Sequence, residues 1–151
     1  MRRVYLVLIA LGILVFLAIS AILARAFSVD SAERGAITSL VQDEARGNQS
    51  GVVSSIYRCA GESTCRTRVL GRAAPLRRSG TVAILEIQSS AGFSLGSTLG
   101  IARVAWRAGT SLPVVQCVRV KRAGNAISGL HVELLAITGR VESDADCPTR
   151  F

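Results

Sequence analysis

The sequence contains few of the groups that carry out chemistry. Its 151 residues include a single histidine, His131, and the 14 glycines are scattered instead of forming a phosphate-binding loop. The G-x-S-x-G context of a hydrolase nucleophile is missing around Ser28, Ser31, Ser54 and Ser55. These absences argue against nucleotide-dependent and hydrolytic activity. We therefore expect a protein that is not an enzyme and has no cofactor.

Charged residues are missing from residues 4–24, and acidic residues are missing from everything before Asp30. A helix of about 20 apolar residues is roughly 30 Å long, which matches the hydrocarbon core of a bilayer. We predict a transmembrane helix or signal anchor over residues 4–24, so the membrane lipid bilayer is the first expected partner. Arg2 and Arg3 precede the run, which predicts that residues 1–3 are cytoplasmic and that the rest is extracytoplasmic.

A cleaved signal peptide is the alternative to an anchor. Residues 24–26 (Ala-Arg-Ala) have the A-x-A form of a cleavage site, and Phe27 would then begin a secreted protein. The apolar run is longer than the usual core of a signal peptide, which favours the uncleaved anchor. No cysteine precedes Cys59, so the segment cannot end in a lipid-modified cysteine.

All four cysteines follow the apolar run. An even number of cysteines in a small extracytoplasmic domain indicates two disulfides, for which three pairings exist. Cys59 and Cys65 bracket a five-residue loop and are the preferred pair, which leaves Cys117 for Cys147. Their spacing does not fit a zinc site, so we expect no metal.

Residues 25–29 are predicted to be a short linker, and residues 30–151 one α+β domain. Asp30 with Glu33 has the form of a capping box, which predicts a helix start there. Whether that helix continues the membrane helix stays open. The helix should end at 46–48, followed by helices from Ser50 and over 63–72. Strands are predicted over 81–88, 99–107, 113–122 and 130–141, with a turn at 123–125. Two to three helices should therefore pack on a curved four-stranded antiparallel sheet.

The segment AITSLVQDEARGNQSGVVSSI, residues 36–56, resembles the start of an NTF2-like (cystatin-like, cone-shaped) domain. The layout of one anchor followed by such a domain is similar to Mce-associated and VirB8-like proteins of the bacterial cell envelope. The resemblance implies a concave sheet face that lines a pocket and a protein partner in the envelope. It extends over roughly residues 30–142.

Four polar or aromatic residues are candidates to line that pocket. His131 and Glu133 lie two residues apart on one predicted strand, so they share a face with Leu135 and Ile137. An imidazole–carboxylate pair can act as acid and base, yet no nucleophile accompanies it. The pocket candidates are Tyr57, Trp106, His131 and Glu133.

Basic residues outnumber acidic ones in the extracytoplasmic part. Of the 18 basic residues only Lys121 is a lysine, which also fits the solvated surface of an arginine-rich protein. Functionally, the excess predicts a surface for anionic lipid or an acidic partner. Nucleic acid is not expected, because the charge lies outside the cytoplasm and has few aromatic neighbours. The candidate surface residues are Arg77, Arg78, Arg119, Lys121 and Arg122.

These observations predict a single-pass, membrane-anchored binding or scaffold protein. Its role would be that of a non-catalytic accessory subunit in an envelope assembly. The alternative is a binder of lipid or another small apolar ligand that uses the concave sheet face. The sequence does not indicate an oligomeric state.

Overall fold

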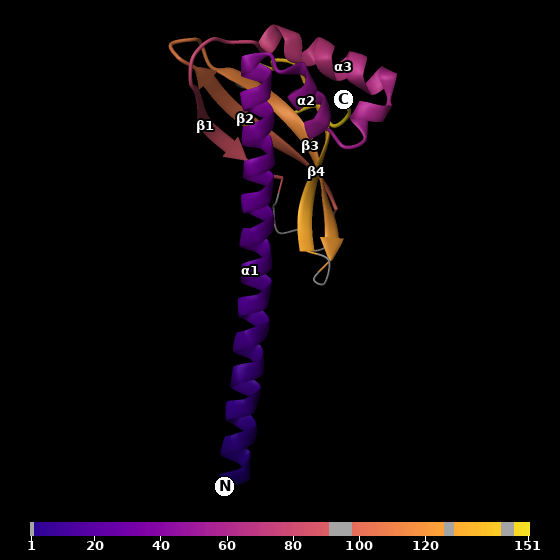
Figure 1. Ribbon diagram of the computed structural model, residues 1–151. Coiled ribbons are helices and arrows are strands. Elements are labelled where there is room, and N and C mark those ends of the chain that lie inside the picture. The colour runs from indigo at the N-terminus through magenta and orange to yellow at the C-terminus, as the bar shows by residue number, and fades with distance from the viewer. Residues whose placement is uncertain (1, 91–97, 126–128, 143–146) are drawn as a thin grey trace.

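The computed structural model describes residues 2–90, 98–125, 129–142 and 147–151, and these form an α+β fold (Figure 1). The helical elements come first: α1 (Arg2–Arg46), α2 (Gln49–Ser55), the 3₁₀ turn η1 (Cys59–Gly61), α3 (Ser63–Ala73) and the 3₁₀ turn η2 (Ala74–Leu76). The strands follow: β1 (Val82–Gln88), β2 (Leu99–Ala108), β3 (Val114–Asn125) and β4 (Gly129–Ile137). They form one antiparallel sheet in the order β1-β2-β3-β4, which confirms the predicted fold class.

Helix α1 runs without a break from the apolar segment into the domain (Figure 1). The predicted linker at residues 25–29 and the predicted helix start at Asp30 are therefore wrong. The sequence has no glycine or proline between residues 13 and 34 that would stop the helix. The carboxylates of Asp30 and Glu33 do not cap a helix. They accept hydrogen bonds from residues that follow β1.

The end of α1 lies where the sequence predicts it. Gly47 has φ +71°, and the amide of Asn48 donates to the carbonyl of Asp43 at 2.9 Å, which is the pattern of a glycine-terminated helix. Asn48 then caps α2, because its Oδ1 accepts from the amide of Gly51 at 3.2 Å. The predicted cap, Ser50, instead donates its hydroxyl to Asn48.

The four strands lie close to their predicted positions, but the predicted turn at 123–125 is wrong. Ala123 pairs with His131 and Asn125 with Gly129, so β3 continues through these residues. Residues 126–128, between the two strands, lie outside the described residues. Beyond β4, Val141 returns to the sheet as an isolated bridge to Val115.

An irregularity in the β3–β4 register changes which side chains share a face. Val120 pairs with Leu134 and Arg119 with Ala136, so Leu135 is left without a partner in the register. Because of this irregularity, the side chains of Glu133 and Ile137 point to opposite faces of the sheet, although the two residues are four positions apart. Ile137 is fully buried in the core, so the prediction that it shares a face with His131 and Glu133 is wrong.

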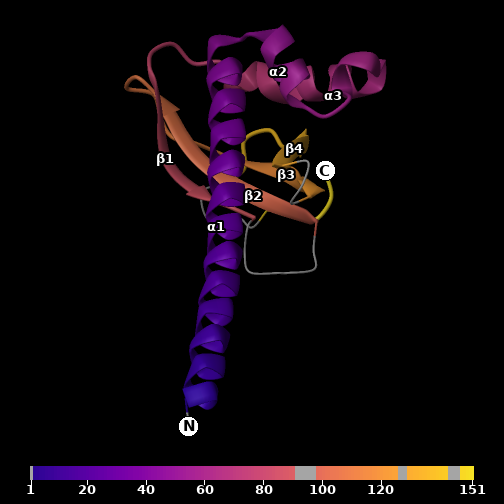
Figure 2. The ribbon, with the colours of Figure 1, turned by 60° about the horizontal axis from the view of Figure 1, so that its bottom comes forward.

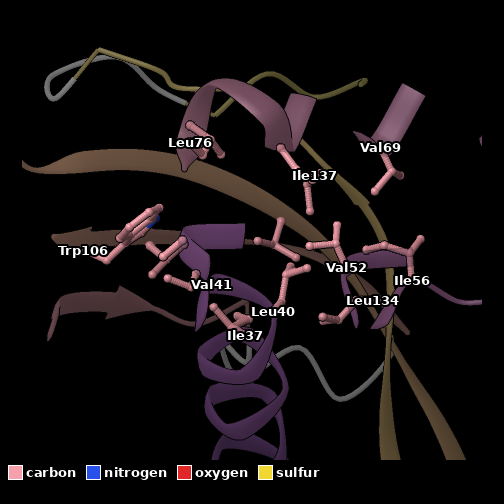
Figure 3. Packing of buried hydrophobic residues seen from close by; sticks show 14 of the residues in the cluster. Ile37, Leu40, Val41, Val52, Ile56, Val69, Leu76, Trp106, Leu134 and Ile137 are labelled. Atoms are coloured by element: carbon pink, nitrogen blue, oxygen red, sulfur yellow. The ribbon is translucent and has the colours of Figure 1, made fainter. Parts of the chain in front are cut away.

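The helices cover one face of the sheet and build the core between them. The C-terminal part of α1 crosses the sheet, and α2 and α3 lie at the end of the domain farthest from the N-terminus (Figures 1 and 2). The core residues come from all these elements and are at most 4% exposed: Ile37, Leu40, Val41, Val52, Ile56, Val69, Leu76, Trp106, Leu134 and Ile137 (Figure 3). Burying each large aliphatic side chain contributes about 1.5–3 kcal/mol.

Candidate functional site

Trp106 belongs to the core and does not line an open pocket. It lies on β2 with 0% of its surface exposed, and Figure 3 shows its ring beside Val41 of α1. The sheet face that carries it is the one that α1 covers. The face on which the sequence places a ligand pocket is therefore packed with the domain's own side chains.

The other three pocket candidates come together on the opposite face. Lys121 and Glu133 are directly paired across β3 and β4, and their neighbours Val120 and Leu134 point into the core. The Lys121 ammonium lies 3.1 Å from the Glu133 carboxylate and 5.5 Å from the centre of the Tyr57 ring. The outward face of β3 and β4 thus carries a cluster of charges beside one aromatic ring.

The chemistry available to this cluster is limited. His131 is 61% exposed, and its Nε2 lies 3.7 Å from Glu133, which already pairs with Lys121. A partly exposed ion pair of this kind contributes about 0–1 kcal/mol to stability. Within the described parts of the chain no three metal-binding side chains are grouped closely enough to hold an ion. The geometry is that of a polar surface and not of an acid–base centre.

The basic residues of β3 are occupied by contacts within the chain. Arg119 donates to the carbonyl of Thr149 at 2.8 Å, and its guanidinium lies 4.9 Å from the centre of the Phe151 ring. Arg122 donates to the carbonyl of Ser90 at 2.7 Å. These arginines position other segments against the sheet, and each has fewer free donors for a partner.

Arg77 and Arg78 lie elsewhere, beside the C-terminal end of α1. The amide of Arg78 donates to the carbonyl of Ala45 at 3.0 Å, and its guanidinium binds the carbonyl of Pro75. The side chain of Arg77 lies directly against Gly47. Positive charge is favourable at this end of a helix, where the carbonyl dipoles are unpaired. The candidate basic residues therefore form two separate surfaces and not one.

Both predicted disulfides are formed. The Cα atoms of Cys59 and Cys65 are 5.3 Å apart, and this bond joins η1 to α3. The Cα atoms of Cys117 and Cys147 are 5.8 Å apart. The second bond holds residues 147–151 on the outward face of β3, where Arg119 contacts them.

Two buried polar residues were not predicted. Glu44 on α1 is 1% exposed, and its carboxylate accepts a hydrogen bond of 2.6 Å from Gln116, which is fully buried on β3. Burial raises the pKa of Glu44 to about 7, and the hydrogen bond from Gln116 opposes this only in part. One oxygen of each residue, and Nε1 of Trp106, lack a hydrogen-bond partner in the described structure. The helical spacing of Glu44 from Ile37 and Leu40 was the signal that could have revealed it.

Two other carboxylates of α1, those of Asp30 and Glu33, connect the helix to the end of β1. The Glu33 carboxylate is fully buried and accepts from the amide and the hydroxyl of Ser90, at 2.7 and 3.0 Å. Asp30 accepts from Ser89 at 2.6 Å and from Arg34 at 2.8 Å, and these hydrogen bonds lower its pKa. The contacts hold the sheet to α1 close to the apolar segment.

One further motif was missed in the sequence. Residues 92–96 read G-F-S-L-G, which fits the hydrolase pattern G-x-S-x-G around Ser94. This segment lies outside the described residues. It falls between β1 and β2, which are antiparallel, whereas the nucleophile turn of a hydrolase joins a strand to a helix. The strand order therefore does not support a hydrolase.

Two shallow hollows on the described part of the surface contain none of the pocket candidates. One has a volume of about 430 Å³ and is lined by Ser63, Thr64, Thr67 and Arg68. The other has about 300 Å³ and is lined by Glu86, Gln88, Arg103, Ala105, Pro113 and Val115. Neither hollow is lined by Tyr57, Trp106, His131 or Glu133.

Comparisons with protein-family models, with curated proteins and with solved structures find no match to this chain. The resemblance to NTF2-like domains therefore stays a prediction. Any functional proposal depends on the geometry and charge described above.

Proposed function

We propose that this chain is a single-pass, membrane-anchored scaffold protein that presents a binding surface outside the cytoplasm. In this proposal it is a non-catalytic accessory subunit that docks to another component of the cell envelope. The bacterial envelope and the NTF2-like family are part of the same proposal. The order of helices followed by a four-stranded antiparallel sheet agrees with the layout expected for that family.

The continuity of α1 is the observation that carries the proposal. Its apolar segment has a mean hydropathy of 3.1 and is long enough to cross a bilayer. The first buried residue of the domain is Val29, about two helical turns beyond Leu23 at 3.6 residues per turn. A domain joined to its anchor by one unbroken helix has a defined height and direction above the membrane. A fixed position of this kind suits a protein that presents a binding surface to a partner.

The packing of the domain favours a surface function over a pocket. The helix-covered sheet face is filled by core side chains, including Trp106. A lipid or small apolar ligand would have to displace α1 to reach that face. The alternative of a ligand binder therefore has no specific observation in its favour.

The disulfides support an extracytoplasmic domain. Structural disulfides form and persist in oxidising compartments, and both cysteine pairs here lie at bonding distance. Arg2 and Arg3 before the apolar segment favour a cytoplasmic N-terminus. Cleavage after Ala26 would cut α1 just before Val29, so the mass of the mature protein distinguishes an anchor from a removed signal.

The experiment combines topology with partner capture from the same cells. A C-terminal tag should be removed by protease added outside cells whose outer layers are opened, and the full-length chain should remain in the membrane fraction. Crosslinking followed by purification in mild detergent should then yield one protein partner in fixed proportion. A tag that is digested only after lysis would overturn the proposed location.

Two controls separate the competing functions. His131→Ala should leave partner binding unchanged, whereas a catalytic role would require its loss. Mass spectrometry of the purified protein should find bulk lipid only. A single tightly held lipid species, together with no protein partner, would support the ligand binder and contradict the scaffold.

A further inference from the structure

A basic surface of the domain lies at the end farthest from the apolar segment. Helix α3, η2 and the last residue of α1 meet there, as Figures 1 and 2 show. We call this surface the distal arginine cap, and its members are Arg46, Arg66, Arg68, Arg72, Arg77 and Arg78. The neighbouring acids are Asp43, which is held by the side-chain amide of Asn48, and Glu62. Positive charge therefore clearly dominates this end of the molecule.

Part of the cap has a structural role and part does not. Arg72 donates to the carbonyl of Ile137 at 2.7 Å, which ties α3 to the end of β4. Arg46, Arg66 and Arg68 are exposed, and their side chains make no hydrogen bond or ion pair with the described parts of the chain. The positive charges of these three side chains are therefore available to an external anion.

The surface between these arginines indicates the kind of anion. Large apolar side chains of the sheet and turns that are exposed in the described structure are Tyr57, Leu85, Leu99 and Leu112, and none belongs to α3 or η2. Protein–protein interfaces depend on a few buried aromatic or aliphatic anchors, which this surface does not offer. Exposed α3 residues between the arginines are small or polar, such as Thr64, Thr67 and Gly71.

We infer that the distal arginine cap binds an acidic polysaccharide of the extracytoplasmic space. This inference rests on the proposed function, because it names a second component, beside the protein partner, that the scaffold would hold. A guanidinium group binds a carboxylate through two parallel hydrogen bonds, and repeated carboxylates along a chain suit several spread arginines. Such binding releases counterions from the polymer and weakens as salt is added.

The position of the cap fits this ligand. The cap and the apolar segment lie at opposite ends of the molecule (Figure 1), so lipid headgroups around the anchor are out of reach of the arginines. The cap instead faces material that lies above the membrane. The continuous helix α1 keeps this end of the domain away from the apolar segment.

The test uses the full-length chain in phosphatidylcholine nanodiscs, which carry no net charge, and immobilised polygalacturonate as the probe. The cap variant replaces three unpaired arginines: Arg46→Gln, Arg66→Gln and Arg68→Gln. The matched control removes the same charge from exposed arginines outside the cap: Arg107→Gln, Arg140→Gln and Arg150→Gln. Fluorescence of the buried Trp106 and a non-reducing gel establish that both variants are folded.

The cap variant should bind polygalacturonate at least about tenfold more weakly, and its slope of log affinity against log salt should fall by about 2–3. The control should change affinity by less than about twofold. Equal losses in both variants would show that net charge alone drives binding and would overturn the inference. Tighter binding to polyglutamate than to polygalacturonate would overturn it in favour of an acidic protein segment.

Failure of the inference and failure of the proposed function are distinguishable. Binding in nanodiscs does not depend on cellular topology, so an intracellular tag would contradict the scaffold without changing the polymer result. Conversely, unchanged binding by the cap variant would remove the polysaccharide and leave the anchored domain with another partner surface.

Discussion

The two halves of α1 have the same backbone conformation but opposite relations to their surroundings. From Val4 to Leu23 the large apolar side chains are 47–68% exposed on every side of the helix. Beyond Val29, only one stripe is buried, and the remaining positions are partly or fully exposed. The first half is apolar all round and suits lipid, while the second half is amphipathic and suits a folded core. One continuous helix is therefore suited to lipid in its first half and to a protein core in its second half. Only the pattern of its side chains distinguishes the two halves.

The stripe in the second half is not purely apolar. Glu33 and Glu44 share it with Ile37 and Leu40, and both carboxylates are at most 1% exposed. Glu33 has two donors from Ser90, whereas Glu44 has one donor from Gln116 and one unpartnered oxygen. The apolar half of α1 thus depends on its overall hydrophobic composition, which a single substitution changes little. The half that packs in the domain depends on specific contacts, which a single substitution can remove.

The largest expected effect comes from truncating the same residue type in each half. Leu40→Ala should lower the free energy of unfolding by about 2–5 kcal/mol, because it leaves a cavity in a fully packed core. Leu14→Ala should leave this free energy unchanged, because Leu14 contacts no part of the domain core. Urea unfolding of the full chain in detergent, followed by Trp106 fluorescence, measures both. Similar losses from the two variants would mean that the halves do not act separately.

Removing a disulfide should destabilise the folded domain without affecting the apolar half of α1. The double variant Cys117→Ala, Cys147→Ala should lose about 2–4 kcal/mol, since the bond restricts a segment of 30 residues in the unfolded chain. Cys59→Ala with Cys65→Ala should lose less, because that separation is only 6 residues. Both variants should still sediment with membranes. Release of either protein from the membrane fraction would contradict the separation of the halves.

The buried Glu44 makes stability depend on pH. Its pKa in the folded protein is about 7, compared with 4.5 for the free side chain, so the folded state holds its proton more tightly. The contribution of Glu44 to the free energy of unfolding is therefore fully present below about pH 4.5. It is lost as the pH rises to about 7, and above that pH it no longer changes. The loss is on the order of 3 kcal/mol, since each tenfold change in proton affinity corresponds to about 1.4 kcal/mol.

Glu44→Gln tests this dependence directly. Unfolding free energies of the variant and the original chain, measured from pH 5 to pH 8, should differ increasingly in favour of the variant as pH rises. Asp43→Asn serves as the control, because Asp43 is partly exposed and lies next in the sequence. A difference that does not change with pH would show that Glu44 ionises in the folded protein as it does in water.

The smallest effect is expected where the domain half ends. Asn48→Ala removes the side chain that caps α2 and should cost about 1 kcal/mol. Gln49→Ala, one residue later and exposed, is the matched control and should change stability by less than about 0.5 kcal/mol. Thermal unfolding followed by circular dichroism is sensitive enough for this comparison. Equal shifts in both variants would assign the capping role to another group.

Local patterns were sufficient for much of the fold. Each strand was visible as a run of β-forming residues between turn residues, and the end of α1 was visible at Gly47. The Cys59–Cys65 pair followed from closeness in sequence, which left Cys117 for Cys147. The predicted strand boundaries were wrong where pairing with a neighbouring strand sets them. Strand β3 extends to Asn125 because residues of β4 pair with its end.

The candidate site was less accessible to sequence reasoning. Trp106 was assigned to a pocket because the sequence predicts that helices pack on the sheet but not which face of the sheet they cover. The arginines were grouped by nearness in sequence, although Arg119 is held by residue 149 and Arg78 by the end of α1. Surface clusters combine residues from distant segments, and no local pattern records which segments meet.

The sequence by itself determined the apolar segment, the α+β class and the cysteine pairs, because hydropathy, periodicity and spacing are local properties. Only the tertiary structure decided the roles of Asp30 and Glu33, whose carboxylates accept hydrogen bonds from Ser89 and Ser90 instead of capping a helix. It also decided that Glu44 is buried. The surroundings of these carboxylates depend on how the sheet packs against α1. The partners are 57 to 72 residues away in the sequence, so no short segment predicts them.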